Sequence, residues 1–209
     1  MKAIIFNSGL GHRMGDETKT HHKSMTVLEN GETIFHRQIR LLSAEGVKDF
    51  IITTGPFAEQ LQAEAANFPA LNFTFVPNEI YDQTNYIYSM FKAREFINDD
   101  MLFLHGDLVF NRKLVRDLLA CPHKSAATVN FSKALPEKDF KGRVKDGKVV
   151  EFIHDGNCKC YAENALNEIF PALSVYAFSY EGYYVDEIDN MDDYARVKKE
   201  ILPFDAAEG

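Results

Sequence analysis

Long apolar runs, a surplus of basic residues and paired cysteine motifs are all missing from this sequence of 209 residues. The apolar start at residues 3–6 stops at Asn7, and no uncharged apolar run approaches the roughly 20 residues that cross a bilayer. No early segment combines a basic stretch, a long apolar core and a small-residue cleavage site. We therefore expect a soluble, cytoplasmic protein without a membrane partner.

Basic residues are outnumbered, and the formal net charge is −8 at pH 7. Proteins that bind nucleic acids use clustered Lys and Arg to release counterions from phosphates, so we expect no nucleic-acid partner. The three cysteines are odd in number, and Cys158 and Cys160 lack the two-residue gap of redox and zinc motifs. We expect them to be free thiols in a reducing compartment.

What the sequence does contain is an alternation of short β-branched and aromatic runs with stretches of helical periodicity. This pattern is typical of a mostly parallel sheet covered by helices. The first half predicts strands at residues 3–6, 49–53, 73–76 and 101–104. Between them it predicts helices at residues 33–45, 58–66 and 85–97.

The second half predicts a different arrangement. A helix capped by Asn111 runs to residue 119, and residues 144–149 form a hairpin with an Asp-Gly turn that fits a sheet's edge. The remaining predicted elements are strands at 126–131, 173–178 and 184–187, and helices at 162–169 and 191–201. Without repeats or a linker, residues 1–209 are predicted to form a single domain. Its α/β class is a Rossmann-like, mostly parallel sheet flanked by helices, with a small antiparallel edge element.

The first strand leads into a glycine-spaced loop, NSGLGHRMG, at residues 7–15. Open α/β sheets bind ligands at this edge, and glycines let backbone N–H groups approach an anion. Arg13 and Lys23 supply the charge that a triphosphate requires. No Lys follows Gly15, which excludes a P-loop, and Met14 stands where a dinucleotide fingerprint needs glycine. A plain surface turn is the remaining alternative.

Two carboxylates follow strands at the same predicted edge. Asp107 comes after the strand at 101–104, and Asp189 after the strand at 184–187. Oxygen ligands that converge on a triphosphate are typical of Mg²⁺. Alternatively, Asp107 caps the following helix, and Asp192 or Asp193 serves the last helix. No histidine is assigned to metal.

These motifs resemble a known family. Residues 3–14, AIIFNSGLGHRM, followed by Thr18 and by HKSM at 22–25, are similar to the signature of the MobA-like NTP transferase (sugar-phosphate nucleotidyltransferase) superfamily. Its usual form is L-A-A-G-x-G-x-R-[ML] followed by P-K. Within it, the sequence resembles bacterial CTP:phosphocholine and phosphonate cytidylyltransferases, which share the His-Lys-Ser element. Asn7 and Ser8 replace the usual Ala-Ala, and His22 replaces the usual Pro.

The resemblance implies roles for individual residues. It implies Mg²⁺ on Asp107 and Asp189, catalytic roles for Lys23 and Arg13, and a GT-A-like nucleotidyltransferase fold. It implies that the nucleotide contacts a set of loop and wall residues: Ser8, Gly9, Leu10, Gly11, His12, Arg13, Lys23, Asn78, Thr84 and Asn85. Asn85 is alternatively a helix N-cap. Candidates for holding a cationic acceptor are aromatic or acidic: Tyr81, Asp82, Tyr86, Tyr161 and Glu163.

The function implied by this resemblance is transfer of CMP from CTP to a small phosphorylated or phosphonylated acceptor, with release of pyrophosphate. The alternatives are a hexose-1-phosphate nucleotidyltransferase that uses UTP, and a non-catalytic nucleotide-binding domain. The short segment between Val150 and the helix at 162–169 departs from relatives, so the acceptor's identity stays open.

Overall fold

The computed structural model describes the chain except for residues 10, 133–140, 154–161 and 207–209. The described chain divides into two compact units, of which the first comprises Met1–Val115 and Tyr184–Gly209 and the second Arg116–Tyr183. Among the helices of the described residues, none has the length and apolar character needed to cross a bilayer.

The first unit is built on a parallel sheet of order β3-β2-β1-β4. Its strands are β1 (Lys2–Asn7), β2 (Asp49–Thr54), β3 (Asn72–Pro77) and β4 (Met101–His105). In register, Asn7 lies beside Thr54, and Phe6 lies beside His105. Because all four strands run the same way, their carboxyl ends meet at one edge. The predicted α/β class with a mostly parallel sheet is confirmed.

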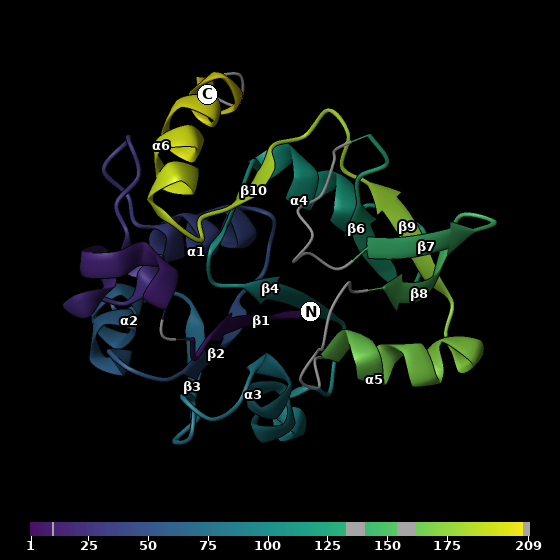
Figure 1. The fold of residues 1–209 in the computed structure, drawn as a ribbon, viewed down its shortest axis with the longest axis horizontal. Helices are drawn as coiled ribbons and strands as arrows, with labels where there is room; N and C mark the ends of the chain where they lie inside the picture. Colours follow the sequence, from purple (N-terminus) through teal and green to yellow (C-terminus); the bar gives the residue numbers. More distant parts are fainter. Residues whose placement is uncertain (10, 133–140, 154–161, 207–209) are drawn as a thin grey trace. The chain divides into compact units, whose positions relative to one another are not determined.

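Both faces of this sheet are covered. The helices of the unit are α1 (Ile34–Ala44), α2 (Ala58–Ala65), α3 (Tyr86–Lys92), α6 (Met191–Glu200) and α7 (Leu202–Ala206). Figure 1 shows α1 and α3 on opposite sides of the sheet. Ile4 and Phe6 pack with Tyr86 of α3. Successive strand side chains point to opposite faces, so Ala3 and Ile5, both fully buried, face the other side.

Helix α1 forms where its apolar stripe predicted it. The Thr33 side chain caps its first turn by accepting a hydrogen bond from the His36 backbone N–H at 3.0 Å. The stripe of Ile34, Ile39 and Leu42 is buried, and Gly46 follows the helix with φ +95°, a conformation that favours glycine.

The helix that follows the third strand and the segment after Asp107 differ from the sequence prediction. The helix predicted at 85–97 ends at Lys92, and a 3₁₀ turn, Arg94–Phe96, continues the chain with tighter hydrogen bonds. Strand β5 (Leu108–Phe110) was not predicted. It pairs antiparallel with β10 (Val185–Glu187), with Leu108 beside Glu187. Three residues are too few to show a period, and the partner strand lies far along the chain.

Helix α4 (Arg112–Leu119) leads into the second unit, which holds a mixed sheet of order β6-β9-β8-β7. Its strands are β6 (Ala126–Val129), β7 (Lys141–Lys145), β8 (Lys148–Ile153) and β9 (Val175–Ser179), with helix α5 (Ala162–Ile169). The predicted hairpin is present, since β7 and β8 pair antiparallel around Asp146 and Gly147, both at positive φ.

A charged cluster at the carboxyl edge of the sheet

The glycine loop follows β1 at the edge where the parallel strands end. Gly11 has φ +64°, and a Cβ atom there would lie 3.1 Å from Cβ of Lys23. Gly11 therefore has a steric reason to be glycine, because it lets the loop pack against the turn that carries Lys23. A Cβ at Gly9 would meet no atom within 4 Å, which leaves open space beside the loop. Leu10 lies outside the described residues.

Lys23 lies at the centre of a charged cluster that also contains Arg13, Asp107 and Asp189. Its ammonium group donates to Asp107 Oδ2 at 2.8 Å and to Asp189 Oδ1 at 2.7 Å. The lysine side chain is 11% exposed, and that of Asp189 is 4% exposed. Arg13, on the 3₁₀ helix His12–Lys19, adds a bidentate pair to Asp189 at 2.9 and 3.0 Å. The structure therefore brings together the two predicted metal ligands and the two predicted catalytic cations.

The electrostatics of this cluster follow from its burial and its charges. Burial by itself lowers the pKa of Lys23, but the carboxylates of Asp107 and Asp189 outweigh it and raise that pKa above its ordinary value. Burial by itself raises the pKa of Asp107, while Lys23 and His105 lower it, and the net direction is down. Both groups are therefore charged at neutral pH.

The pairing of β5 with β10 places the carboxylates side by side. The Ile188 backbone N–H donates to the Asp107 carbonyl at 3.1 Å, so the residue that follows β10 is bonded directly to the residue that precedes β5. Gln38 of α1 holds the other side, because its Nε2 donates to the carbonyls of His105 at 3.0 Å and Leu108 at 2.8 Å. The position of Asp107 is thus held by hydrogen bonds to its own carbonyl and to the carbonyls of His105 and Leu108.

Glu187 is a third carboxylate that the sequence prediction missed. Oxygen atoms of Asp107, Glu187 and Asp189 lie within 4.8 Å of one another. The signal was the Glu-Ile-Asp triplet, since residues i and i+2 of an extended segment point to the same side. At the last helix, α6, the cap is Asn190, whose side chain accepts hydrogen bonds from the backbone N–H groups of Asp192 and Asp193.

His22 holds the start of the glycine loop through a hydrogen bond to Asn7. It is 4% exposed, and its Nε2 lies 2.7 Å from the Asn7 carbonyl. A carbonyl only accepts, so Nε2 carries the proton, and Nδ1 accepts from the Ser24 backbone N–H at 3.2 Å. Burial lowers the pKa of His22 to about 4, which keeps the ring neutral.

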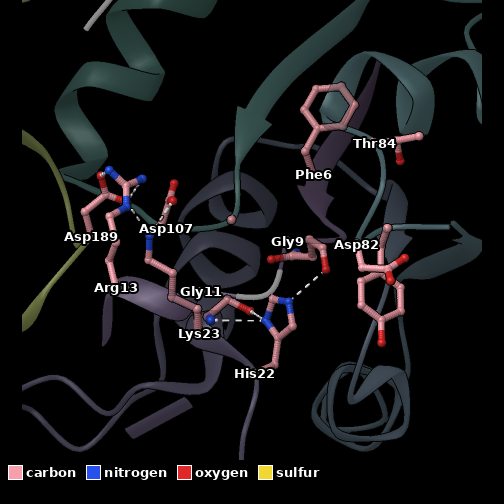
Figure 2. Close-up of a pocket in the computed structure, with 14 residues that line it drawn as sticks. Phe6, Gly9, Gly11, Arg13, His22, Lys23, Asp82, Thr84, Asp107 and Asp189 are labelled. Atoms are coloured by element: carbon pink, nitrogen blue, oxygen red, sulfur yellow. Dashed lines mark hydrogen bonds and ion pairs between the residues drawn. The ribbon is translucent and has the colours of Figure 1, made fainter. Parts of the chain in front are cut away.

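A cavity of about 410 Å³ opens over these groups. Figure 2 shows the charged cluster of Arg13, Lys23, Asp107 and Asp189 at one end and Phe6, Asp82 and Thr84 at the other. Of the predicted acceptor residues, Tyr81 and Asp82 line this cavity. Tyr161 lies outside the described residues, and Glu163 belongs to α5 in the second unit.

A smaller cavity of about 150 Å³ lies on the α3 side, and Phe6, Gly9, Tyr81, Thr84 and Asp107 line both cavities. The smaller one also contains Ser8, Asn78, Asn85, Tyr86 and Ser89. Its polar residues bond one another. Asn78 Nδ2 donates to Thr84 Oγ1 at 3.0 Å and to Ser89 Oγ at 3.1 Å, and Ser8 Oγ lies 2.6 Å from Ser89 Oγ.

Asn85 is the N-cap of α3, because its side chain accepts from the Ile87 backbone N–H at 3.2 Å. The alternative role given to Asn85 is therefore present in the structure, and the residue also lines the smaller cavity. The predicted nucleotide contacts at Asn78, Thr84 and Asn85 thus share one wall. His12 lies in the 3₁₀ helix that follows the glycine loop.

Known proteins are similar to this chain in sequence and in fold. The sequence is 26% identical to the choline-phosphate cytidylyltransferase of Haemophilus influenzae over 97% of this chain and 98% of that protein. It is also 26% identical to the CMP-5'-(3-aminopropyl)phosphonate synthase of Streptomyces rubellomurinus, over 74% of this chain but only 25% of that protein. The solved CTP:phosphocholine cytidylyltransferase of Streptococcus pneumoniae superposes with a TM-score of 0.76 at 20% identity, covering 96% of this chain and 98% of that one.

The profile of the MobA-like NTP transferase domain matches residues 3–165, most of the chain. That span contains the glycine loop, Lys23 and Asp107, which the structure gathers around one cavity. The chain therefore belongs to the MobA-like NTP transferase family and is a nucleotidyltransferase.

Proposed function

We propose that this protein transfers CMP from CTP to a small phosphorylated or phosphonylated acceptor and releases pyrophosphate. The observation that carries the proposal is the Lys23 ammonium held between Asp107 and Asp189 beside the glycine loop. CTP is proposed because the relatives described above are a choline-phosphate cytidylyltransferase and a CMP-phosphonate synthase. Residues 1–209 act in this proposal as one nucleotidyltransferase domain in the cytoplasm.

Mg²⁺ is the cation that fits the carboxylate cluster. Asp107, Glu187 and Asp189 offer only oxygen ligands, which hard divalent cations prefer. Asp107 Oδ1 is buried and has no hydrogen-bond partner among the described residues, as expected of an oxygen atom that coordinates a metal ion. We assign these three residues to the metal. When bound, Mg²⁺ supplies positive charge that stabilises phosphate oxygens.

The reaction is an in-line displacement at the α-phosphorus of CTP. An anionic oxygen of the acceptor's phosphate or phosphonate forms a bond to that phosphorus as the bond to the bridging oxygen of the β-phosphate breaks, and pyrophosphate leaves with the electron pair. The nucleophile already carries its charge, so no general base is required. Catalysis consists of positioning and charge stabilisation.

The cations of the cluster perform that stabilisation. Lys23 neutralises charge that develops around the α-phosphorus, a role suited to an ammonium whose raised pKa keeps it protonated. Arg13 lines both the 410 Å³ cavity and an adjoining one of about 490 Å³, so it is placed for the β- and γ-phosphates. Backbone N–H groups of the glycine loop complete the phosphate site.

Residues that line the two cavities suit the cytosine base and the acceptor. Cytosine offers an amino donor beside two acceptors, and amide and hydroxyl groups of Asn78, Thr84 and Asn85 suit such a pattern. Uracil would place a carbonyl where the amino donor is wanted. In the larger cavity, the ring of Tyr81 and the carboxylate of Asp82 suit a cationic acceptor group, since a cation over an aromatic ring gains roughly 0.5–2 kcal/mol.

Pyrophosphate release tests this proposal. CTP, UTP, ATP and GTP are each paired with phosphocholine, phosphoethanolamine, aminoethylphosphonate and glucose 1-phosphate, with Mg²⁺ present. We expect release with CTP and an amine-bearing acceptor. Release with UTP and glucose 1-phosphate would instead establish the hexose-1-phosphate activity, and CTP binding without release in any pair would indicate a non-catalytic domain.

The acceptor site is tested by Asp82→Asn, which removes the carboxylate while keeping its shape. We expect a raised KM for the amine-bearing acceptor and little change in the KM for CTP. The matched control is Asp99→Asn, at an exposed carboxylate that pairs with the amino terminus and lines none of these cavities. Equal acceptor KM values in the two variants would remove Asp82 from the acceptor site.

A further inference from the structure

Asn7 ends strand β1 with a rigid backbone. Its N–H donates to Thr53 Oγ1 at 3.1 Å, and its carbonyl accepts from His22 Nε2 at 2.7 Å. The residue is 2% exposed. The position of its side chain is therefore set by anchors on both sides of the Cα atom.

The Asn7 carboxamide differs from its backbone in this respect. Neither Nδ2 nor Oδ1 has a hydrogen-bond partner among the residues that the structure describes, although both atoms are buried. Buried amide groups without partners are rare because their desolvation is costly. Asn7 lines the 410 Å³ cavity, so the cavity is the side from which a ligand group would approach the buried carboxamide.

Gly106 makes room for this side chain. A Cβ atom at Gly106 would lie 1.7 Å from Asn7 Oδ1 and 2.6 Å from Asn7 Cγ, which no side chain tolerates. Gly106 has no positive φ, so the glycine is needed here for space. A side chain at position 106, next to Asp107, is therefore incompatible with the carboxamide of Asn7.

The missing partner must both accept and donate. An ionised phosphate oxygen only accepts, and would leave Asn7 Oδ1 unpaired. A hydroxyl group does both. Asn7 stands between Phe6, which lines both cavities, and Ser8, which lines the smaller one. A nucleotide with its base in the smaller cavity and its phosphates at Lys23 has its ribose at this junction.

We propose that Asn7, whose carboxamide fills the space that Gly106 leaves, is a specificity-determining residue and that this carboxamide binds a ribose hydroxyl of the nucleotide. This proposal rests on the proposed function, because it requires a nucleoside triphosphate that spans the two cavities. It makes the enzyme selective for ribonucleotides over deoxyribonucleotides.

Equilibrium binding of CTP, 2'-deoxy-CTP and 3'-deoxy-CTP in the presence of Mg²⁺ tests the proposal. In the wild type, we expect one of the two deoxynucleotides to bind about ten- to a hundredfold more weakly than CTP, because its loss of a hydroxyl leaves Asn7 unpaired. In Asn7→Ala that ratio should fall to within about twofold of unity. Thr26→Val is the control, since the Thr26 hydroxyl is also buried and unpartnered in the described chain but lies outside both cavities. It should keep the wild-type ratio.

The steric relationship between Asn7 and Gly106 is tested separately by thermal unfolding. Gly106→Ala should lower the melting temperature, and adding Asn7→Ala should recover most of that loss, since it removes the clashing carboxamide and leaves the Phe6 carbonyl, at 3.1 Å, as the remaining close atom. The recovered double variant should still bind CTP and its deoxy analogues equally.

The outcomes separate this proposal from the proposed function. A wild-type ratio that persists in Asn7→Ala and in the double variant means that the carboxamide does not bind the ribose hydroxyl, and overturns the inference alone. Equal binding of CTP and both analogues by the wild type also overturns it. CTP binding no tighter than UTP binding contradicts the proposed base instead, and the ribose ratio is then read with UTP. A wild type that binds no nucleotide overturns both.

Discussion

Lys23 Nζ lies 2.7 Å from Asp189 Oδ1, although 166 residues separate them along the chain. The same ammonium lies 2.8 Å from Asp107 Oδ2. One cation thus holds two carboxylates, Asp107 at 18% and Asp189 at 4% exposed, that are also proposed as Mg²⁺ ligands, so the lysine and the metal compete for the same side chains.

Lys23→Ala should reduce turnover by a factor of about 10² or more, because it removes charge that stabilises the transition state. The measurement is pyrophosphate release at saturating CTP. Lys19→Ala is the matched control, at a lysine that is 71% exposed and pairs with Asp16. Turnover near that of the control would remove Lys23 from the catalytic machinery.

The same variant predicts a change in stability. Without the ammonium, Asp107 and Asp189 lose a counter-charge in a buried setting, which is destabilising. We expect Mg²⁺ to raise the melting temperature of Lys23→Ala by more than it raises that of the wild type, since no ammonium competes for the carboxylates. Equal shifts in both proteins would place the metal elsewhere.

Asp107→Asn, Glu187→Gln and Asp189→Asn should each raise the Mg²⁺ concentration needed for half-maximal activity, because an amide lacks the charge that a hard cation needs. Asp186→Asn is the control on the same strand, at a carboxylate that pairs with Arg196. A variant that needs no more Mg²⁺ than this control identifies a residue with a structural role only.

His22 predicts how stability depends on pH. Its folded-state pKa of about 4 lies below its ordinary value of 6.5, so the unfolded chain takes up the proton first as the pH falls. The contribution is fully present above pH 6.5 and is lost towards pH 4, by about 3 kcal/mol in the free energy of unfolding.

His22→Gln can keep a donor to the Asn7 carbonyl but cannot titrate. We expect its urea-unfolding free energy to fall less than that of the wild type between about pH 7 and about pH 4.5. The same fall in both proteins would show that other groups cause the acid sensitivity.

Gln38→Met keeps the size of a buried side chain but removes both hydrogen bonds that hold the carbonyls of His105 and Leu108. We expect kcat to fall roughly ten- to a hundredfold through misplacement of Asp107, with the KM for CTP little changed. Gln62→Met, at an exposed glutamine of α2, is the control. A raised KM with an unchanged kcat would contradict this positioning role.

The sequence by itself determined the α/β class, the main strands and the glycine loop, because each depends on local periodicity or on conformations that only glycine adopts readily. It also placed Asp107 and Asp189 after strands, and hence at one edge. Glu187 was readable in the Glu-Ile-Asp triplet, but its relevance depends on which way an extended segment faces a distant one.

Only the tertiary structure decided the rest. The pairing of β5 with β10 brings Asp189 to Asp107, and a strand of three residues whose partner is remote leaves no local pattern. The clash that requires Gly106 to be glycine arises from Asn7, which lies on a neighbouring strand. Such contacts depend on the packing of side chains that are close in space and far apart in sequence, which periodicity cannot encode.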